Sequence, residues 1–179
     1  KRFAKVLEQT YTRFLDLQKA ETQAKEAQIE TALERVRSRT MAMHKTEDLR
    51  EVVGVLYEQV SLLNLADTGC NINIFKEAHI NVIETWMAGF DGVSLPECYY
   101  GEAIGHPSIK KAWKKWKAQA APFHISLAGK ALHDYTSYLL EETDLKRIPD
   151  DFKELMLSIP KAHFSYITFK YGQIQIVNS

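Results

Sequence analysis

The chain has 179 residues, enough for one globular domain of roughly 100–150 residues plus an extended element. Lysine and arginine total 23, and aspartate and glutamate also total 23, so the net charge gives no argument for a nucleic-acid or acidic-membrane partner. Two cysteines exclude a disulfide framework, and no apolar run approaches the roughly 18–20 residues that cross a bilayer. We therefore expect a cytoplasmic domain without direct membrane contact.

Residues 1–44 predict one continuous helix of the coiled-coil type. From Arg2 to about Met43 there is no proline or glycine, and the strongest helix formers dominate. Apolar side chains recur in steps of three and four, with one slip in phase after Ala24. We assign the following residues to a dimer interface: Phe3, Leu7, Phe14, Leu17, Ala24, Ile29, Leu33 and Val36.

The predicted helix is too long for its own domain to cover. About 40 residues at 1.5 Å each span roughly 60 Å, so much of the apolar stripe needs a second chain. A parallel homodimer is the simplest solution, although the pattern leaves antiparallel pairing open. The alternative is a solitary surface helix, which would leave large apolar side chains in water.

Residues 45–179 predict an α+β domain. Thr46, followed by Glu47 and Asp48, is typical of a helix N-cap, and apolar residues then repeat at helical spacing to Leu63. Strands are predicted at about 71–76 and 79–86, with a break at 77–78 and a turn at 88–92. Residues 93–107 predict a mostly irregular loop, where functional residues are often found.

The second half of the domain predicts three helices and three strands. The helices are expected at about 109–120, 129–142 and 150–158, and the strands at 122–127, 163–170 and 173–177. Tyr171-Gly172 is a tight-turn signal between the last two strands. We therefore expect an antiparallel sheet of five to six strands flanked by helices.

A small-ligand pocket is the candidate functional site. Aromatic walls with a few polar groups are typical of such pockets, and the aromatic and histidine residues of the central segment could supply them. The candidate ligand-binding residues are Trp86, Tyr99, Tyr100, His106 and His124. The alternative is that these side chains only cap the sheet.

The sequence patterns for other kinds of functional site are weaker. The lysines around Trp113 and Trp116 could form a nucleic-acid patch, but both indoles fall on an apolar helical face, so we expect a core role and no nucleic-acid partner. Six histidines lack metal-site spacing, and there is no nucleophile elbow or phosphate loop. We expect no metal, no cofactor and no catalysis. Cys98 could form a thioether link or act as a redox site, but a structural thiol is the stronger interpretation. The run Glu141–Asp144 could hold a cation, but a solvated turn is the stronger interpretation there.

The order of elements resembles a GAF domain, which belongs to the PAS/profilin-like group of antiparallel sheets flanked by helices. Residues 33–43, Leu-Glu-Arg-Val-Arg-Ser-Arg-Thr-Met-Ala-Met, followed by Glu-Asp-Leu at 47–49, resemble the junction before GAF-type domains in sensor histidine kinases and related signalling proteins of Bacteroidetes. Residues 1–11 resemble the closing helix of a preceding GAF unit, and residues 140–144 resemble a segment of the same repeat. The resemblance implies a domain at 45–179 that lacks its own closing helix.

The resemblance also implies intracellular sensing and relay through a dimer, with the output domain elsewhere in a longer protein. We therefore expect a non-catalytic sensory and dimerisation module of a two-component or related system, which binds an unknown small molecule or relays a signal through a dimeric helix. One alternative is a structural dimerisation spacer that binds nothing. A weaker alternative is a small-molecule enzyme that uses the scattered histidines.

Overall fold

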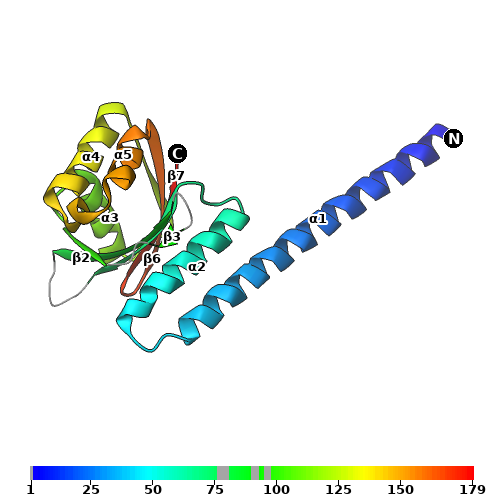
Figure 1. Cartoon of the computed structure of the whole chain (residues 1–179). Helices are drawn as coiled ribbons and strands as arrows, with labels where there is room; N and C mark the ends of the chain where they lie inside the picture. The colour runs from blue at the N-terminus through cyan, green and yellow to red at the C-terminus, as the bar shows by residue number, and fades with distance from the viewer. Residues whose placement is uncertain (1, 76–80, 90–92, 95–97) are drawn as a thin grey trace.

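The computed structural model describes residues 2–75, 81–89, 93–94 and 98–179. The fold is α+β: a long N-terminal helix precedes an antiparallel sheet that carries helices on both faces (Figure 1). This agrees with the class predicted from the sequence. The predictions for the break at 77–78, for His79 and for the turn at 90–92 lie outside the described residues.

The first helix, α1, spans Arg2–Met41 and projects away from the rest of the molecule (Figure 1). Its 40 residues confirm the predicted uninterrupted helix. The end of α1 lies beside α2, which spans Leu49–Leu62, and Arg39 forms an ion pair with Glu51 across the two helices. Among the described residues of α1, Ala32 alone is buried. The helix is therefore attached to the domain only near its C-terminal end.

A short connection reverses the chain between α1 and α2. Asp48 Oδ2 accepts hydrogen bonds from the backbone amides of His44 at 2.8 Å and Lys45 at 3.2 Å. Thr46 begins a 3-10 turn, Thr46–Asp48, so the prediction that Thr46 is the N-cap of the second helix is wrong. The Asp48 carboxylate therefore fastens the connection before α2, because a charged acceptor forms strong hydrogen bonds with both amides.

The sheet follows the order β3-β2-β1-β7-β6-β5, and every described pairing is antiparallel. The short strand β4 also pairs with β2, so β3 and β4 occupy successive parts of one edge. The strand bounds are β1 Gly69–Phe75, β2 Val82–Gly89, β3 Val93–Ser94, β4 Tyr99–Glu102, β5 Phe123–Ala128, β6 Lys161–Phe169 and β7 Gly172–Asn178.

Two features of the sheet differ from the prediction. Strands β3 and β4 form within the segment 93–107 that was predicted as mostly loop, because both pair with β2 and Tyr99 of β4 is buried. β2 continues through Gly89, so the predicted turn does not begin at residue 88. The predicted closing hairpin is confirmed, with its turn at Lys170-Tyr171, one residue earlier than predicted. Gly172 begins β7, where a Cβ would collide with the carbonyl oxygen of Asn73.

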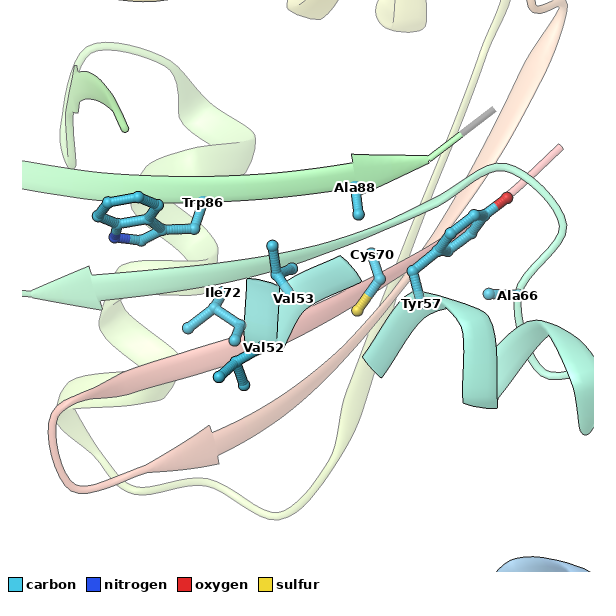
Figure 2. Packing of buried hydrophobic residues seen from close by; sticks show 8 residues of the cluster. All are labelled: Val52, Val53, Tyr57, Ala66, Cys70, Ile72, Trp86 and Ala88. Atoms are coloured by element: carbon cyan, nitrogen blue, oxygen red, sulfur yellow. The ribbon is translucent and has the colours of Figure 1, made fainter. Parts of the chain in front are cut away.

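Helix α2 covers one face of the sheet at β1 and β2. Val52, Val53 and Tyr57 of α2 pack against Cys70 and Ile72 of β1, with Trp86 and Ala88 of β2 completing the cluster (Figure 2). These helix residues lie at positions i, i+1 and i+5, which face one side of a helix. This cluster anchors α2, and through it α1, to the centre of the sheet.

Three helices cover the opposite face: α3 Pro107–Lys117, α4 Gly129–Glu142 and α5 Asp150–Ser158 (Figure 1). The core role predicted for the tryptophans of α3 is confirmed. Trp116 stacks on Phe75 with 4.3 Å between ring centroids, and its Nε1 donates to the carbonyl oxygen of Phe169 at 2.9 Å. Trp113 packs against the same small cluster. In the part of the chain that the structure describes, no helix is both long and apolar enough to cross a membrane.

Candidate functional site

A cavity of about 140 Å³ lies between the sheet and helices α3, α4 and α5. Its walls are mainly apolar and include Ile83 and Met87 of β2, Leu132 of α4 and Phe164 of β6. Strands β1 and β7 form the centre of the sheet and contribute its polar floor. Because side chains alternate along a strand, every second residue of these two strands faces this cavity.

The polar floor is a row of four amide side chains, Asn71, Asn73, Gln173 and Gln175. The register pairs Asn71 with Gln175 and Asn73 with Gln173, so all four lie on one face. Asn71 Nδ2 donates to Gln175 Oε1 at 2.9 Å, and Asn73 Nδ2 is 3.4 Å from the same oxygen. On the β2 side, Thr85 Oγ1 donates to Asn73 Oδ1 at 2.9 Å. Three members of the row, Asn71, Asn73 and Gln175, are thus held in place by hydrogen bonds to one another and to Thr85.

Gln173 differs from the other members of this row. Its side chain is buried, with 3% of its surface exposed, and it lines the cavity. Its Oε1 has no hydrogen-bond partner among the described residues. A buried carbonyl oxygen without a donor costs about 1–3 kcal/mol, so such atoms call for an explanation.

Two buried tyrosines continue the polar floor towards β6 and α4. Gln175 Nε2 donates to the hydroxyl of Tyr166 at 3.0 Å. Burial raises the pKa of Tyr135 to about 12, and a hydrogen bond with Gln175 opposes this shift. Burial, together with the nearby Tyr135, raises the pKa of Tyr166 well above its usual value. Both hydroxyls are therefore neutral at physiological pH, so the floor carries hydrogen-bonding groups without charge.

The structure does not bring the five predicted ligand-binding residues together. Tyr99 is buried and lines the cavity, as expected of a site residue. Trp86 lies on the other face of the sheet, where it packs in the α2 cluster and its Nε1 donates to Glu84 Oε1 at 3.2 Å (Figure 2). The register explains this placement, since Trp86 pairs with Ile72, whereas Thr85 pairs with Asn73 on the cavity face.

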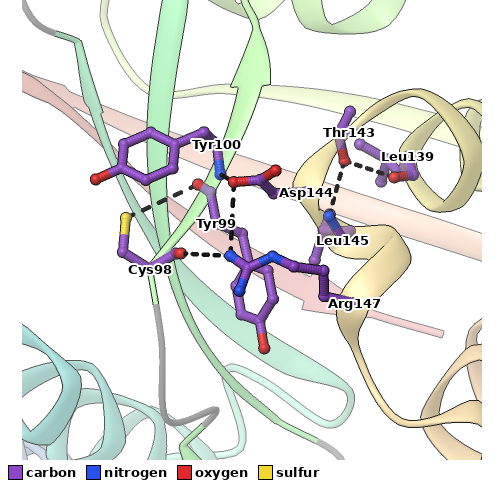
Figure 3. A network of polar contacts seen from close by, with 8 residues as sticks. All are labelled: Cys98, Tyr99, Tyr100, Leu139, Thr143, Asp144, Leu145 and Arg147. Carbon is purple, nitrogen blue, oxygen red and sulfur yellow. Dashed lines mark hydrogen bonds and ion pairs between the residues drawn. The ribbon is translucent and has the colours of Figure 1, made fainter.

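Tyr100 is exposed on β4, where it borders the cavity beside Tyr99 and also lies next to a polar cluster at the end of α4 (Figure 3). Its backbone amide donates to Asp144 Oδ2 at 3.3 Å, and Asp144 is 3.5 Å from the guanidinium of Arg147. Arg147 also lies over the ring of Tyr99 and donates to the carbonyl oxygen of Cys98 at 3.4 Å. This cluster fastens β4 to the 3-10 turn Asp144–Arg147.

The same cluster shows what the acidic run Glu141–Asp144 does. Thr143 caps the 3-10 turn by accepting a hydrogen bond from the Leu145 amide at 3.2 Å, and Asp144 pairs with Arg147. These contacts agree with the prediction of a helix-ending turn. Among the described residues, no group of three histidine, cysteine, aspartate or glutamate side chains is placed to hold a metal ion.

The two predicted histidines lie on different faces of the sheet. His106 begins α3, where its Nδ1 accepts from the Ser108 amide at 3.2 Å and its ring packs beside Tyr135 and Tyr138. Burial lowers the pKa of His106, and Asp134 opposes that shift. His124 is exposed on β5, on the face away from the cavity, with Nδ1 2.9 Å from Ser165 Oγ. Neither histidine lines the cavity.

The amide row is what the sequence analysis missed. Asn71 and Asn73 alternate with Ile72 and Ile74, and Gln173 and Gln175 alternate with Ile174 and Ile176. Alternation of this kind usually marks a strand with one face in solvent, so the pattern by itself gives no reason to place the amides in a cavity. The signal available in the sequence was the same amide pattern in two strands that are far apart along the chain. Comparisons with protein-family models, curated proteins and solved structures find no match for this chain.

Proposed function

We propose that this chain is a non-catalytic sensory and dimerisation module of a cytoplasmic bacterial signalling protein, with a GAF-like domain at residues 45–179. A small molecule occupies the cavity beneath α3, α4 and α5, and paired α1 helices at residues 1–44 carry the response to neighbouring parts of the protein. The observation that carries the proposal is the long helix, most of whose apolar stripe is not covered by any described part of its own chain.

The exposure of α1 supports pairing with a second copy. Phe3, Leu7 and Leu17 expose 87%, 69% and 56% of their surface, and no described element of the domain covers them. The other assigned interface residues, Phe14, Ala24, Ile29 and Leu33, are also exposed, whereas Val36 is half-buried in the stretch beside α2. The proposed interface therefore runs from Phe3 to Leu33, and α2 takes over at Ala32 and Val36.

The two central strands supply a route from the cavity to α1. In β1, Asn71 and Asn73 face the cavity while Cys70 and Ile72 pack against α2. A ligand that repositions the amides therefore acts on the same strands that anchor α2, and α2 is the helix beside α1. Packed helices have discrete arrangements, so a bias of about 1–3 kcal/mol suffices to shift their populations.

The GAF-like assignment is supported by the order of elements and by the resemblance of residues 33–43 described above. The antiparallel sheet has a helix on one face and a cavity under helices on the other. An enzyme receives less support, because His106 lies on the cavity side whereas His124 and His163 lie on the opposite face of the sheet. A spacer that binds nothing remains the main alternative.

A thermal-shift screen against nucleotides, haem, bilins and common metabolites separates a sensor from a spacer. A ligand at 100 times its dissociation constant stabilises the folded chain by about 2.7 kcal/mol. The control is Ala112→Leu, because Ala112 is buried in α3 and lines the cavity, so the larger side chain reduces the space for a ligand. We expect a hit whose shift is lost in this variant. Silence across the screen, or a shift that survives Ala112→Leu, would favour the spacer.

A further inference from the structure

The chemistry of the cavity specifies the class of molecule that it takes. We infer that the ligand is an uncharged molecule of single-ring size that donates an N–H or O–H hydrogen bond to Oε1 of Gln173. This inference rests on the proposed sensory function, since it concerns the same cavity. It adds the size, the charge and the orientation of the ligand, each of which follows from a separate observation.

The size follows from the volume. The cavity measures about 140 Å³. A protein cavity of about 150 Å³ lined by aliphatic and aromatic side chains accommodates benzene. The flat faces of an aromatic or saturated ring would lie against Ile83, Leu132 and Phe164. A nucleotide or a haem is several times larger than this space.

The absence of charge follows from the lining. Among the described lining residues, Glu102 is the only acidic or basic one, and it is exposed on the edge strand β4. The other polar groups are amides and neutral hydroxyls, as the raised pKa values of Tyr135 and Tyr166 indicate. An ion placed here would lose its hydration without gaining a counter-charge, which costs several kcal/mol.

The hydrogen bond follows from the difference between the two glutamines. Gln175 has its oxygen occupied by Asn71 and Asn73 and its nitrogen occupied by Tyr166. The oxygen of Gln173 is buried in the same cavity and has no donor among the described residues. A donor on the ligand would satisfy it. The row therefore contains one preformed acceptor, set among groups that are already paired.

Phenol and toluene test the inference directly, because they have nearly the same shape and differ by a hydroxyl in place of a methyl group. Dissociation constants measured by isothermal titration calorimetry at pH 7 should show phenol binding about tenfold more tightly than toluene, the value expected of one buried hydrogen bond. Benzoate and benzylammonium, which carry opposite charges on the same ring, should not bind. Equal binding of phenol and toluene, or preferential binding of either ion, would overturn the inference.

Variants of Gln173 and Gln59 locate the effect, since each has one buried side-chain atom without a partner in the described part of the chain. Gln173→Leu removes the acceptor and should abolish the preference for phenol, with toluene binding at least as well. Gln59→Leu is the matched control, since Gln59 is equally buried but lies in α2 on the other face of the sheet. It should leave the ratio of the two dissociation constants unchanged. If Gln173→Leu does not fold, Gln173→Met removes the same oxygen with an unbranched side chain.

The outcomes distinguish the ligand class from the proposed function. A preference for phenol that persists in the Gln173 variant, or that disappears in the Gln59 variant, would contradict the assignment of the acceptor. If none of the four ring compounds binds but the screen finds another ligand that Ala112→Leu excludes, the class is wrong and the sensory function stands. If neither experiment finds a ligand, both the class and the sensory function fail.

Discussion

Cys70 lies at the centre of the contact between α2 and the sheet, with none of its surface exposed. Burial raises the pKa of this thiol from 9.0 to about 12. The folded chain therefore keeps the proton over a range in which the unfolded chain has lost it. The thiolate is the nucleophilic form, so a structural role fits Cys70 better than a reactive one.

This shift predicts a pH dependence of stability. Because the pKa is higher in the folded state, the stabilisation is complete below pH 9 and is lost as the pH rises towards 12. The contribution of Cys70 should reach a slope of about 1.4 kcal/mol per pH unit in this range. Urea unfolding at several pH values should show a shallower loss for Cys70→Ala than for the natural chain. Equal pH slopes for the variant and the natural chain would show that burial does not raise the pKa of Cys70.

The amide row shows why single residues of the site were hard to predict. Asn71 and Gln175 are far apart in sequence, and only the register of β1 against β7 places them together. The register of β2 against β1 and β4 sends Trp86 to the opposite face, away from Tyr99. A sequence shows which strands alternate, but a shift of one residue exchanges their faces. Residue types alone therefore favoured aromatic side chains over the buried amides.

At the scale of elements, the long helix was predicted well and the edge of the sheet was not. α1 lacks proline and glycine and is rich in helix formers, so local preferences suffice to define it. β4 has only four residues, and its strand conformation depends on pairing with β2. Short edge strands of this kind are set by tertiary contacts, which a local pattern does not reveal.

The contact between α1 and α2 depends on a small side chain. Ala32 is 7% exposed, and a larger residue there would force the helices apart. We predict that Ala32→Arg lowers the free energy of unfolding by about 1–3 kcal/mol. Ala27→Arg makes the same change at an exposed position of the same helix and should have an effect within about 0.5 kcal/mol. Urea denaturation followed by circular dichroism measures both, and equal effects would argue against close packing at Ala32.

At the scale of the whole molecule, the sheet has the cavity on one face and α2, with the projecting α1 beside it, on the other (Figure 1). The α+β class, the antiparallel sheet and the helices on its faces could be predicted, because apolar periodicity marks each long element. The cavity could not, since it arises where helices α3, α4 and α5 meet strands that are distant in sequence. The apolar stripe of α1, by contrast, is visible in the sequence, and most of it is exposed in the structure.

The mass of the chain in solution tests the central claim most directly. If α1 pairs through Phe3 to Leu33, multi-angle light scattering should give twice the chain mass of 20.5 kDa at micromolar concentration. Replacing Leu7 and Leu17 with glutamate should return the mass to that of one chain, because charges would then enter the seam. A mass of one chain for the natural sequence, persisting at hundreds of micromolar, would contradict the dimeric relay.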